Sequence, residues 1–140
     1  MTPAKRTHIL LIEDHPEAAE MVKCCLEPSG YTIHVEGSGK DGLSYAWEHQ
    51  PDLVILDLKL PDLHGYEVCE ELRRLFRGRE LPILMLTVMN EPMDRFLGIS
   101  HGADVYLTKP FEPAELRSTV ERLLRGEWIV PDVPLQRENR

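Results

Sequence analysis

The chain has 140 residues, of which 42% are hydrophobic and 29% charged, a composition typical of one ordinary globular domain. Its formal net charge of −8 argues against direct binding of nucleic acid, because such binding depends on neutralising phosphates. No apolar stretch approaches the roughly 20 residues that a membrane helix requires, and the N-terminus has no signal-peptide pattern, so a cytoplasmic location is expected.

Short apolar segments predict strands, and amphipathic segments predict the helices between them. The strands are expected at residues 7–12, 31–35, 53–56, 81–87 and 104–107. The helices are expected at residues 16–29, 38–49, 66–77, 90–101 and 112–125. Because strands and helices alternate, the predicted fold class is α/β, with a parallel sheet covered on both faces.

Helical spacing predicts which side chains of the first three helices face the core. These are Ala18, Val22, Cys25 and Leu26, then Leu43, Ala46 and Trp47, then Val68, Leu72, Leu75 and Phe76. The three cysteines form no Cys-x-x-Cys pair and are predicted to be free thiols. The six histidines show no ligand spacing, and His15 and His64 are interpreted as ordinary surface residues.

Carboxylates directly follow two of the predicted strands. The run 53–56 ends on Asp57, and the run 8–12 leads into Glu13 and Asp14. In a parallel sheet the carboxyl ends of the strands meet at one edge, beside the ligand crevice. Three carboxylates gathered there repel one another unless a cation is present. The sequence therefore predicts a Mg²⁺ site built around one reactive aspartate, Asp57.

Other residues with chemical potential also follow predicted strands. Thr87 ends the fourth strand, Lys109-Pro110 follows the fifth, and Pro61 and Gly65 break the chain after the aspartate. Each alone has an ordinary explanation, since Thr87 is a common strand residue and Lys109 a common solvated one. Their joint occurrence, in order and at strand ends, indicates one site.

With these residues, the chain resembles the receiver domain of two-component response regulators over residues 7–126. The resemblance implies a doubly wound, five-stranded parallel sheet of strand order 2-1-3-4-5, with five helices. Residues 127–140 are then a tail or the start of a linker. Lys109-Pro110 also resembles the family's cis peptide bond.

The resemblance also implies a role for each acidic residue. Asp57 would accept a phosphoryl group from the phosphohistidine of a sensor histidine kinase or phosphotransfer protein. Asp14, Asp57 and the backbone carbonyl of Lys59 would hold Mg²⁺, and Glu13 would orient metal-bound water. The chain would not be an enzyme acting on separate substrates, because it would catalyse only its own phosphorylation and dephosphorylation.

The resemblance also implies roles for three further residues in charge neutralisation and switching. Lys109 would pair with the aspartate and then with the phosphoryl group, and Thr87 would hydrogen-bond a phosphoryl oxygen. Thr87 would move toward that group while Tyr106 rotates inward behind it. The movement would switch a surface formed by the fourth helix, the fifth strand and the last helix.

Several features leave alternatives open. A receiver-like interaction module that is no longer phosphorylated is the main alternative, and an output domain, an effector protein or a homodimer are open as partners. Val88 stands where the family mostly has alanine. Val105 and Thr119 stand where regulators with winged-helix outputs usually carry an aspartate and an arginine, which puts that family's dimer in doubt.

Overall fold

The computed structural model describes residues 6–88, 97 and 99–127. Five parallel strands form one sheet of order β2-β1-β3-β4-β5, which confirms the predicted topology. The strands are β1 (His8–Ile12), β2 (Thr32–Glu36), β3 (Leu53–Leu56), β4 (Ile83–Thr87) and β5 (Val105–Thr108). The helices are α1 (Pro16–Leu26), the 3-10 turn η1 (Glu27–Ser29), α2 (Gly39–His49), α3 (Gly65–Leu75) and α5 (Pro113–Leu124).

Two predicted segments fall wholly or partly outside the described residues. The helix expected at 90–101 falls mostly on residues 89–96 and 98, although Leu97, Ile99 and Ser100 have helical geometry. The expected tail falls on residues 128–140 apart from Glu127, which is described.

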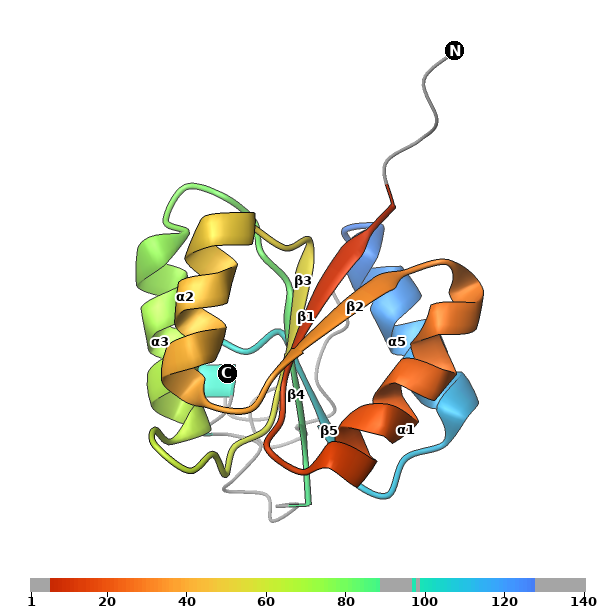
Figure 1. Cartoon of the computed structure of the whole chain (residues 1–140). Helices are drawn as coiled ribbons and strands as arrows, with labels where there is room; N and C mark the ends of the chain where they lie inside the picture. Colours follow the sequence, from red (N-terminus) through yellow and green to blue (C-terminus); the bar gives the residue numbers. More distant parts are fainter. Residues whose placement is uncertain (1–5, 89–96, 98, 128–140) are drawn as a thin grey trace, which may run out of the picture.

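The sheet separates two layers of helices, with α2 and α3 over one face and α1 and α5 over the other (Figure 1). Successive residues of β1 point to opposite faces: Leu10 and Ile12 join the core under α2 and α3, while Ile9 and Leu11 join the core under α1 and α5. Strand β3 lies between β1 and β4 and is buried throughout. Covering on both faces explains why β1, β3 and β4 are nearly continuous apolar runs.

The predicted inner face of α2 is confirmed for two of its three side chains, because Ala46 is buried and Leu43 packs against the core. Trp47 was expected inside but is 55% exposed, and its ring lies against the flank of the core, 6.3 Å from the ring of Phe76. Small residues face the sheet instead, because a Cβ on Gly42 would lie only 2.5 Å from Cδ1 of Ile12. At Gly42, helix α2 therefore lies too close to the sheet to accommodate a side chain.

Smaller differences occur on the two neighbouring helices. On α1 the fully buried alanine is Ala19, and Ala18 is only half-buried. On α3 Cys69 is buried, whereas Leu75 is exposed near the end of the helix. The other predicted inner residues of the two helices are confirmed, with Val22, Leu26, Val68, Leu72 and Phe76 buried and Cys25 half-buried.

The N-terminus of α2 is tied to the loop that follows β3. The Ser38 hydroxyl accepts a hydrogen bond from the N–H of Asp41 at 3.1 Å and so caps the helix. Asp62, from the loop after β3, accepts bonds from the N–H groups of Gly39 at 2.8 Å and Lys40 at 2.9 Å. The loop that carries the residues after Asp57 is therefore fixed to a second element.

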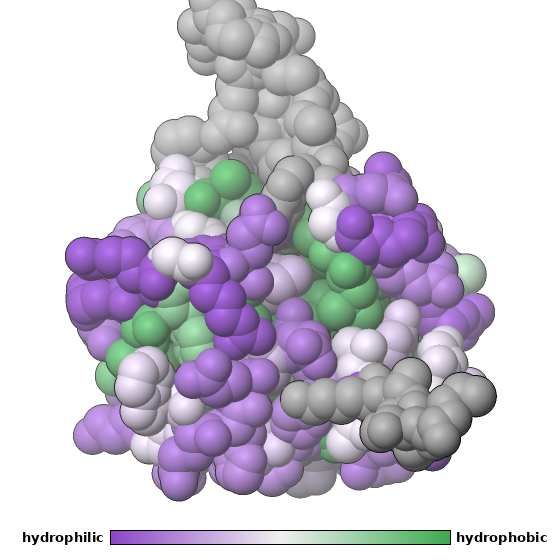
Figure 2. Space-filling model, turned by 90° about the horizontal axis from the view of Figure 1, so that it is seen from above, coloured by the Kyte–Doolittle hydropathy of each residue, from purple (hydrophilic) through white to green (hydrophobic). Residues whose placement is uncertain are grey.

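Helix α5 ends in a Schellman motif centred on a left-handed glycine. Gly126 has φ +77°, and its N–H bonds to the carbonyl of Leu123, while the N–H of Glu127 bonds to the carbonyl of Arg122. The described helices include none long and apolar enough to cross a membrane. Seen from the end at which the strands begin, the surface is mostly hydrophilic, with hydrophobic residues in smaller separate areas (Figure 2).

The Asp62 contacts give a pH-dependent prediction. The N–H groups of Lys40 and Gly39 hold the pKa of the Asp62 carboxyl below its usual value. A carboxyl with a lowered folded-state pKa contributes stability above its unfolded pKa of about 3.9, and that contribution is lost as the pH falls through the folded pKa. We expect Asp62→Ala to lower the free energy of unfolding by about 1 kcal/mol at neutral pH, with the difference shrinking below about pH 4.

Urea unfolding at several pH values measures this difference. Asp41→Ala is the matched control, because it removes an exposed carboxylate from the first turn of the same helix. Equal losses for the two variants at every pH would show that the Asp62 contacts add nothing beyond the helix dipole.

Candidate functional site

The register between β1 and β3 brings three carboxylates to one edge of the sheet. Ile12 pairs with Leu56, so the next residues, Glu13 and Asp57, come side by side. Both are nearly inaccessible, with 3% and 7% exposure. Asp14 is half-buried beside them. One ligand atom from each of these three residues and from His15 lies within 4.8 Å of the others, so the predicted acidic cluster exists as a compact group.

Lys109 supplies a cation to this cluster. Its Nζ lies 2.5 Å from Oε1 of Glu13 and 3.5 Å from Oδ2 of Asp57. Its backbone N–H donates to the carbonyl of Thr87 at 2.8 Å, and the Lys109–Pro110 peptide bond is cis. The sequence predicted a pair with Asp57, and the structure adds a closer one with Glu13. One ammonium against three carboxylates leaves two negative charges uncompensated.

One carboxylate oxygen indicates where a cation fits. Oδ1 of Asp14 is buried and has no hydrogen-bond partner among the described residues. An oxygen in that position loses its hydration and accepts no hydrogen bond in return, although Nδ1 of His15 lies 3.2 Å away, so binding by a further group would stabilise it. A divalent cation would meet this need and balance the two remaining charges. The oxygen-rich donor set suits a hard ion such as Mg²⁺.

A pocket of about 460 Å³ opens above Asp57. Thr87, buried at the end of β4, and Lys109 line it together with the exposed Lys59. Val88 is 60% exposed and forms part of its rim. A small anion could therefore reach the Asp57 carboxylate and meet positive charge there.

The loop after Asp57 is held by close backbone packing. A Cβ on Gly65 would lie 2.6 Å from Cα of Leu58 and 2.7 Å from the carbonyl oxygen of Asp57, so only glycine fits. His64 caps α3, because its Nδ1 accepts from the N–H of Tyr66 at 3.2 Å. The predicted break at Gly65 thus has a steric cause, and the backbone N–H of Lys59 lies 3.4 Å from Oδ1 of Asp57.

Tyr106 lies apart from the carboxylates, in the core beneath the site. It is buried on β5, where it pairs with Met85 of β4, and the same ladder pairs Thr87 with Thr108. The proximity of Thr87 and Tyr106 on neighbouring strands agrees with their predicted positions. Their roles, and that of the Lys59 carbonyl, remain predictions.

His15 belongs to the cluster, which the sequence reasoning missed. Its Nδ1 lies 3.3 Å from Oε2 of Glu13 and 3.2 Å from Oδ1 of Asp14. No spacing rule indicates this contact, because it depends on how the chain turns from β1 into α1. The available signal was only the position of a histidine directly after two predicted ligands.

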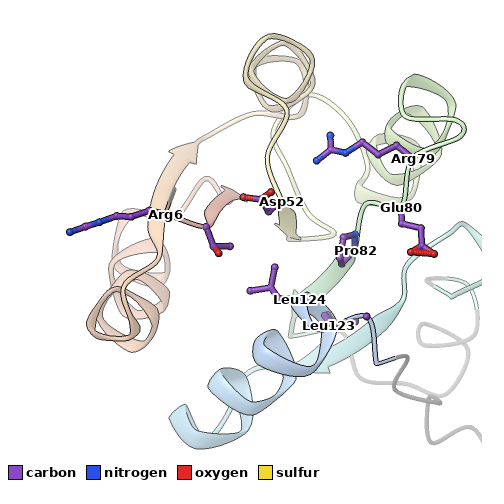
Figure 3. A pocket seen from close by; sticks show the side chains of 9 residues that line it. Arg6, Asp52, Arg79, Glu80, Pro82, Leu123 and Leu124 are labelled. Atoms are coloured by element: carbon purple, nitrogen blue, oxygen red, sulfur yellow. The ribbon is translucent and has the colours of Figure 1, made fainter. Parts of the chain in front are cut away.

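A second pocket, of about 420 Å³, lies at the opposite end of the sheet (Figure 3). Its charged side chains are of both signs, and two of them, Asp52 and Arg79, make structural contacts. Asp52 accepts from the N–H of His8 at 2.8 Å, and Arg79 donates to the carbonyl of Pro51 at 2.6 Å and lies over the ring of Phe76. Converging carboxylates mark the other end of the sheet as the functional site.

Comparison with known proteins identifies relatives of this arrangement. The family model described as response regulator receiver domain matches residues 9–121. The DNA-binding dual master transcriptional regulator RpaA of Synechocystis sp. is 42% identical over 123 residues, covering 88% of this chain and 51% of that protein. The alkaline phosphatase synthesis transcriptional regulatory protein PhoP of Bacillus subtilis is 41% identical over 121 residues, covering 86% and 50%. The chain spans about half the length of these relatives.

Solved structures of response regulators also superpose on this chain. A response regulator from Chloroflexus aurantiacus superposes with a TM-score of 0.82 at 36% identity, covering 86% of this chain and 99% of that one. The BeF3-activated N-terminal receiver domain of RstA from Klebsiella pneumoniae superposes with a TM-score of 0.80 at 30% identity, covering 85% and 99%.

The unpartnered Asp14 oxygen predicts a metal-dependent stability. At about 100 times its dissociation constant, Mg²⁺ should raise the free energy of unfolding by about 2.7 kcal/mol, a melting shift of roughly 8 °C. Asp14→Ala should lose most of that shift, while its metal-free form melts at or above the wild-type temperature because one repelling charge is gone. Thermal melts with and without Mg²⁺ measure both effects.

Glu17→Gln is the control, because Glu17 lines the same pocket but lies outside the carboxylate cluster. It should keep the full Mg²⁺ shift. If Asp14→Ala also keeps it, Asp14 is not a metal ligand.

Proposed function

Because the chain belongs to the response regulator receiver domain family, we propose that Asp57 is its phosphoacceptor and takes a phosphoryl group from the phosphohistidine of a sensor histidine kinase or phosphotransfer protein. The supporting observation is the setting of the Asp57 carboxylate. It directly follows the central strand β3, lines a 460 Å³ pocket, and lies 3.5 Å from the Lys109 ammonium.

In phosphoryl transfer the protein mainly positions the reacting groups and neutralises charge. A carboxylate oxygen of Asp57 forms the new bond to phosphorus while the bond from phosphorus to the donor's imidazole nitrogen breaks, in line. Lys109, already within reach of Asp57, neutralises charge on the transferring oxygens. The Thr87 hydroxyl, in the wall of the pocket, donates to one of those oxygens.

Mg²⁺ is the proposed cofactor, and it supplies neutralisation of the negative charge that attacking and transferring oxygens share. Asp14 and Asp57 would hold it together with the backbone carbonyl of Lys59. Glu13, at 2.5 Å from Lys109, would orient metal-bound water. The coarser conclusion, a divalent-metal site in the acidic cluster, rests on the unpartnered Asp14 oxygen.

The signal passes from the site to other proteins in this proposal. The relatives are DNA-binding and transcriptional regulators about twice the matched length, so we infer that the chain acts on an output domain or effector protein. DNA contact would belong to that partner, since this chain carries a formal charge of −8. Catalysis would be limited to its own phosphorylation and dephosphorylation. Self-association as a homodimer is an open alternative.

The phosphoacceptor assignment has a direct test. Acetyl phosphate with Mg²⁺ should add one phosphoryl group to the protein, and Asp57→Asn should abolish the addition. Intact-mass measurement detects the added group. Asp62→Asn is the matched control: it lies in the same loop, its amide oxygen can still accept hydrogen bonds, and labelling should continue.

Two outcomes would count against this assignment. Unchanged labelling of Asp57→Asn would move the acceptor elsewhere. No labelling of the wild-type protein by acetyl phosphate or a kinase would favour the alternative, a receiver-like interaction module.

The position of Val88 predicts the rates of both reactions. Its β-branched side chain has little rotamer freedom and stands on the rim above Asp57. It narrows the path for the incoming donor and for the water that hydrolyses the acyl phosphate. Because most of the side chain points into solvent, we expect Val88→Ala to raise both rates only about two- to threefold. Time courses of labelling and loss measure both rates, and an effect on only one of them would exclude shared access as the cause.

The proposed switch predicts a spectroscopic response at Tyr106. Beryllofluoride, standing in for the phosphoryl group, should draw Thr87 toward Asp57 and alter the packing around the Tyr106 ring on the paired strand. NMR spectra should then show shifted Tyr106 ring signals. Shifts confined to the loops after β1 and β3 would leave Tyr106 as ordinary core packing. Tyr31 serves as the internal reference, because it lies directly before β2, the outer strand on the side of the sheet away from β5.

A further inference from the structure

The imidazole of His15 is directed at the carboxylates although packing does not confine it. The side chain is 70% exposed, yet Nδ1 lies 3.2 Å from Oδ1 of Asp14 and 3.3 Å from Oε2 of Glu13. Oδ1 of Asp14 is the buried oxygen that has no hydrogen-bond partner among the described residues. A ring nitrogen and an unsatisfied carboxylate oxygen therefore face the same small volume.

The backbone holds His15 in this position. It occupies the N-cap of α1 with extended angles, φ −92° and ψ 114°. Pro16 follows at the first helical position and disfavours the helical conformation for the residue before it. The N–H of His15 lies 3.2 Å from Oε2 of Glu13, and its carbonyl accepts from the N–H of Ala19 at 3.0 Å. Only the two side-chain torsions remain to be fixed.

The distances agree with those between two ligands of one ion. Neighbouring ligands of an octahedral ion, each bound at about 2.1 Å, are about 3.0 Å apart. The 3.2 Å between Nδ1 of His15 and Oδ1 of Asp14 is close to this value. An ion bound to Asp14 could therefore meet the imidazole without movement of the backbone.

We propose that His15 is an additional ligand of the metal site, so that this receiver accepts borderline transition-metal ions such as Ni²⁺ or Co²⁺ alongside Mg²⁺. This inference rests on the proposed divalent-metal site and extends its ligand set. Imidazole suits transition metals such as nickel and zinc, whereas Mg²⁺ favours oxygen ligands and keeps several waters. The nitrogen therefore adds affinity for the former and little for the latter.

Calorimetric titration of the full chain, without a polyhistidine tag and at about pH 8 where free imidazole is neutral, tests the proposal. Ni²⁺ and Mg²⁺ are titrated separately into wild type, His15→Ala and Asp14→Asn. We expect His15→Ala to weaken Ni²⁺ binding at least about tenfold and Mg²⁺ binding by less than about twofold. Asp14→Asn should weaken both, which locates Ni²⁺ at this site.

His49→Ala is the matched control for binding to other histidines. His49 is exposed at the end of α2, where its ring stacks on Tyr45, and its removal should leave Ni²⁺ binding unchanged. Pulsed electron paramagnetic resonance of bound Mn²⁺ gives a second readout, because a coordinated imidazole produces ¹⁴N modulation that His15→Ala should remove.

Equal weakening of both ions in His15→Ala, unchanged Ni²⁺ affinity, or strong Ni²⁺ binding that survives Asp14→Asn would each overturn the proposal. Retained Mg²⁺ binding in His15→Ala shows that the variant is folded. Loss of labelling by acetyl phosphate in the wild type would instead contradict the phosphoacceptor function, so the two failures are distinguishable.

Discussion

Repulsion among three carboxylates is the constraint on which the functional end of this molecule depends. The β1–β3 register places Glu13 and Asp57 side by side, with Asp14 directly after Glu13. At an effective dielectric of about 20, attraction to Lys109 amounts to about 7 kcal/mol for Glu13 and about 5 kcal/mol for Asp57. One lysine cannot neutralise three carboxylates, so the site keeps a net negative charge. A bound divalent cation would neutralise it.

The rest of the fold keeps these groups from separating. Strand order puts β3 between β1 and β4, and both faces are buried under helices, so the strand ends cannot shift independently. Gly65 lets α3 begin against the backbone of Asp57, and Asp62 ties the same loop to α2. The acidic site is therefore built on segments that are fixed from two sides.

The sequence correctly predicted the features that follow from hydrophobic periodicity and from the positions of residues at strand ends. The five strands and the gathering of Glu13, Asp14, Asp57 and Lys109 follow from apolar runs and from the geometry of parallel sheets. The sequence did not predict features that depend on how closely two elements pack. Trp47 is exposed, and helix α2 approaches Ile12 closely at Gly42. His15 was missed because its ring position depends on one turn, which hydropathy does not describe.

The central claim is that a metal ion and Lys109 together neutralise the negative charge around Asp57 when it carries a phosphoryl group. A crystal structure with beryllofluoride and Mg²⁺ tests this claim most directly. The account predicts beryllofluoride on an Asp57 oxygen, the metal against Asp14, and Nζ of Lys109 moved from Glu13 to a fluorine. Beryllofluoride at another residue, or a Lys109 that still pairs with Glu13 at 2.5 Å while the site is filled, would contradict it.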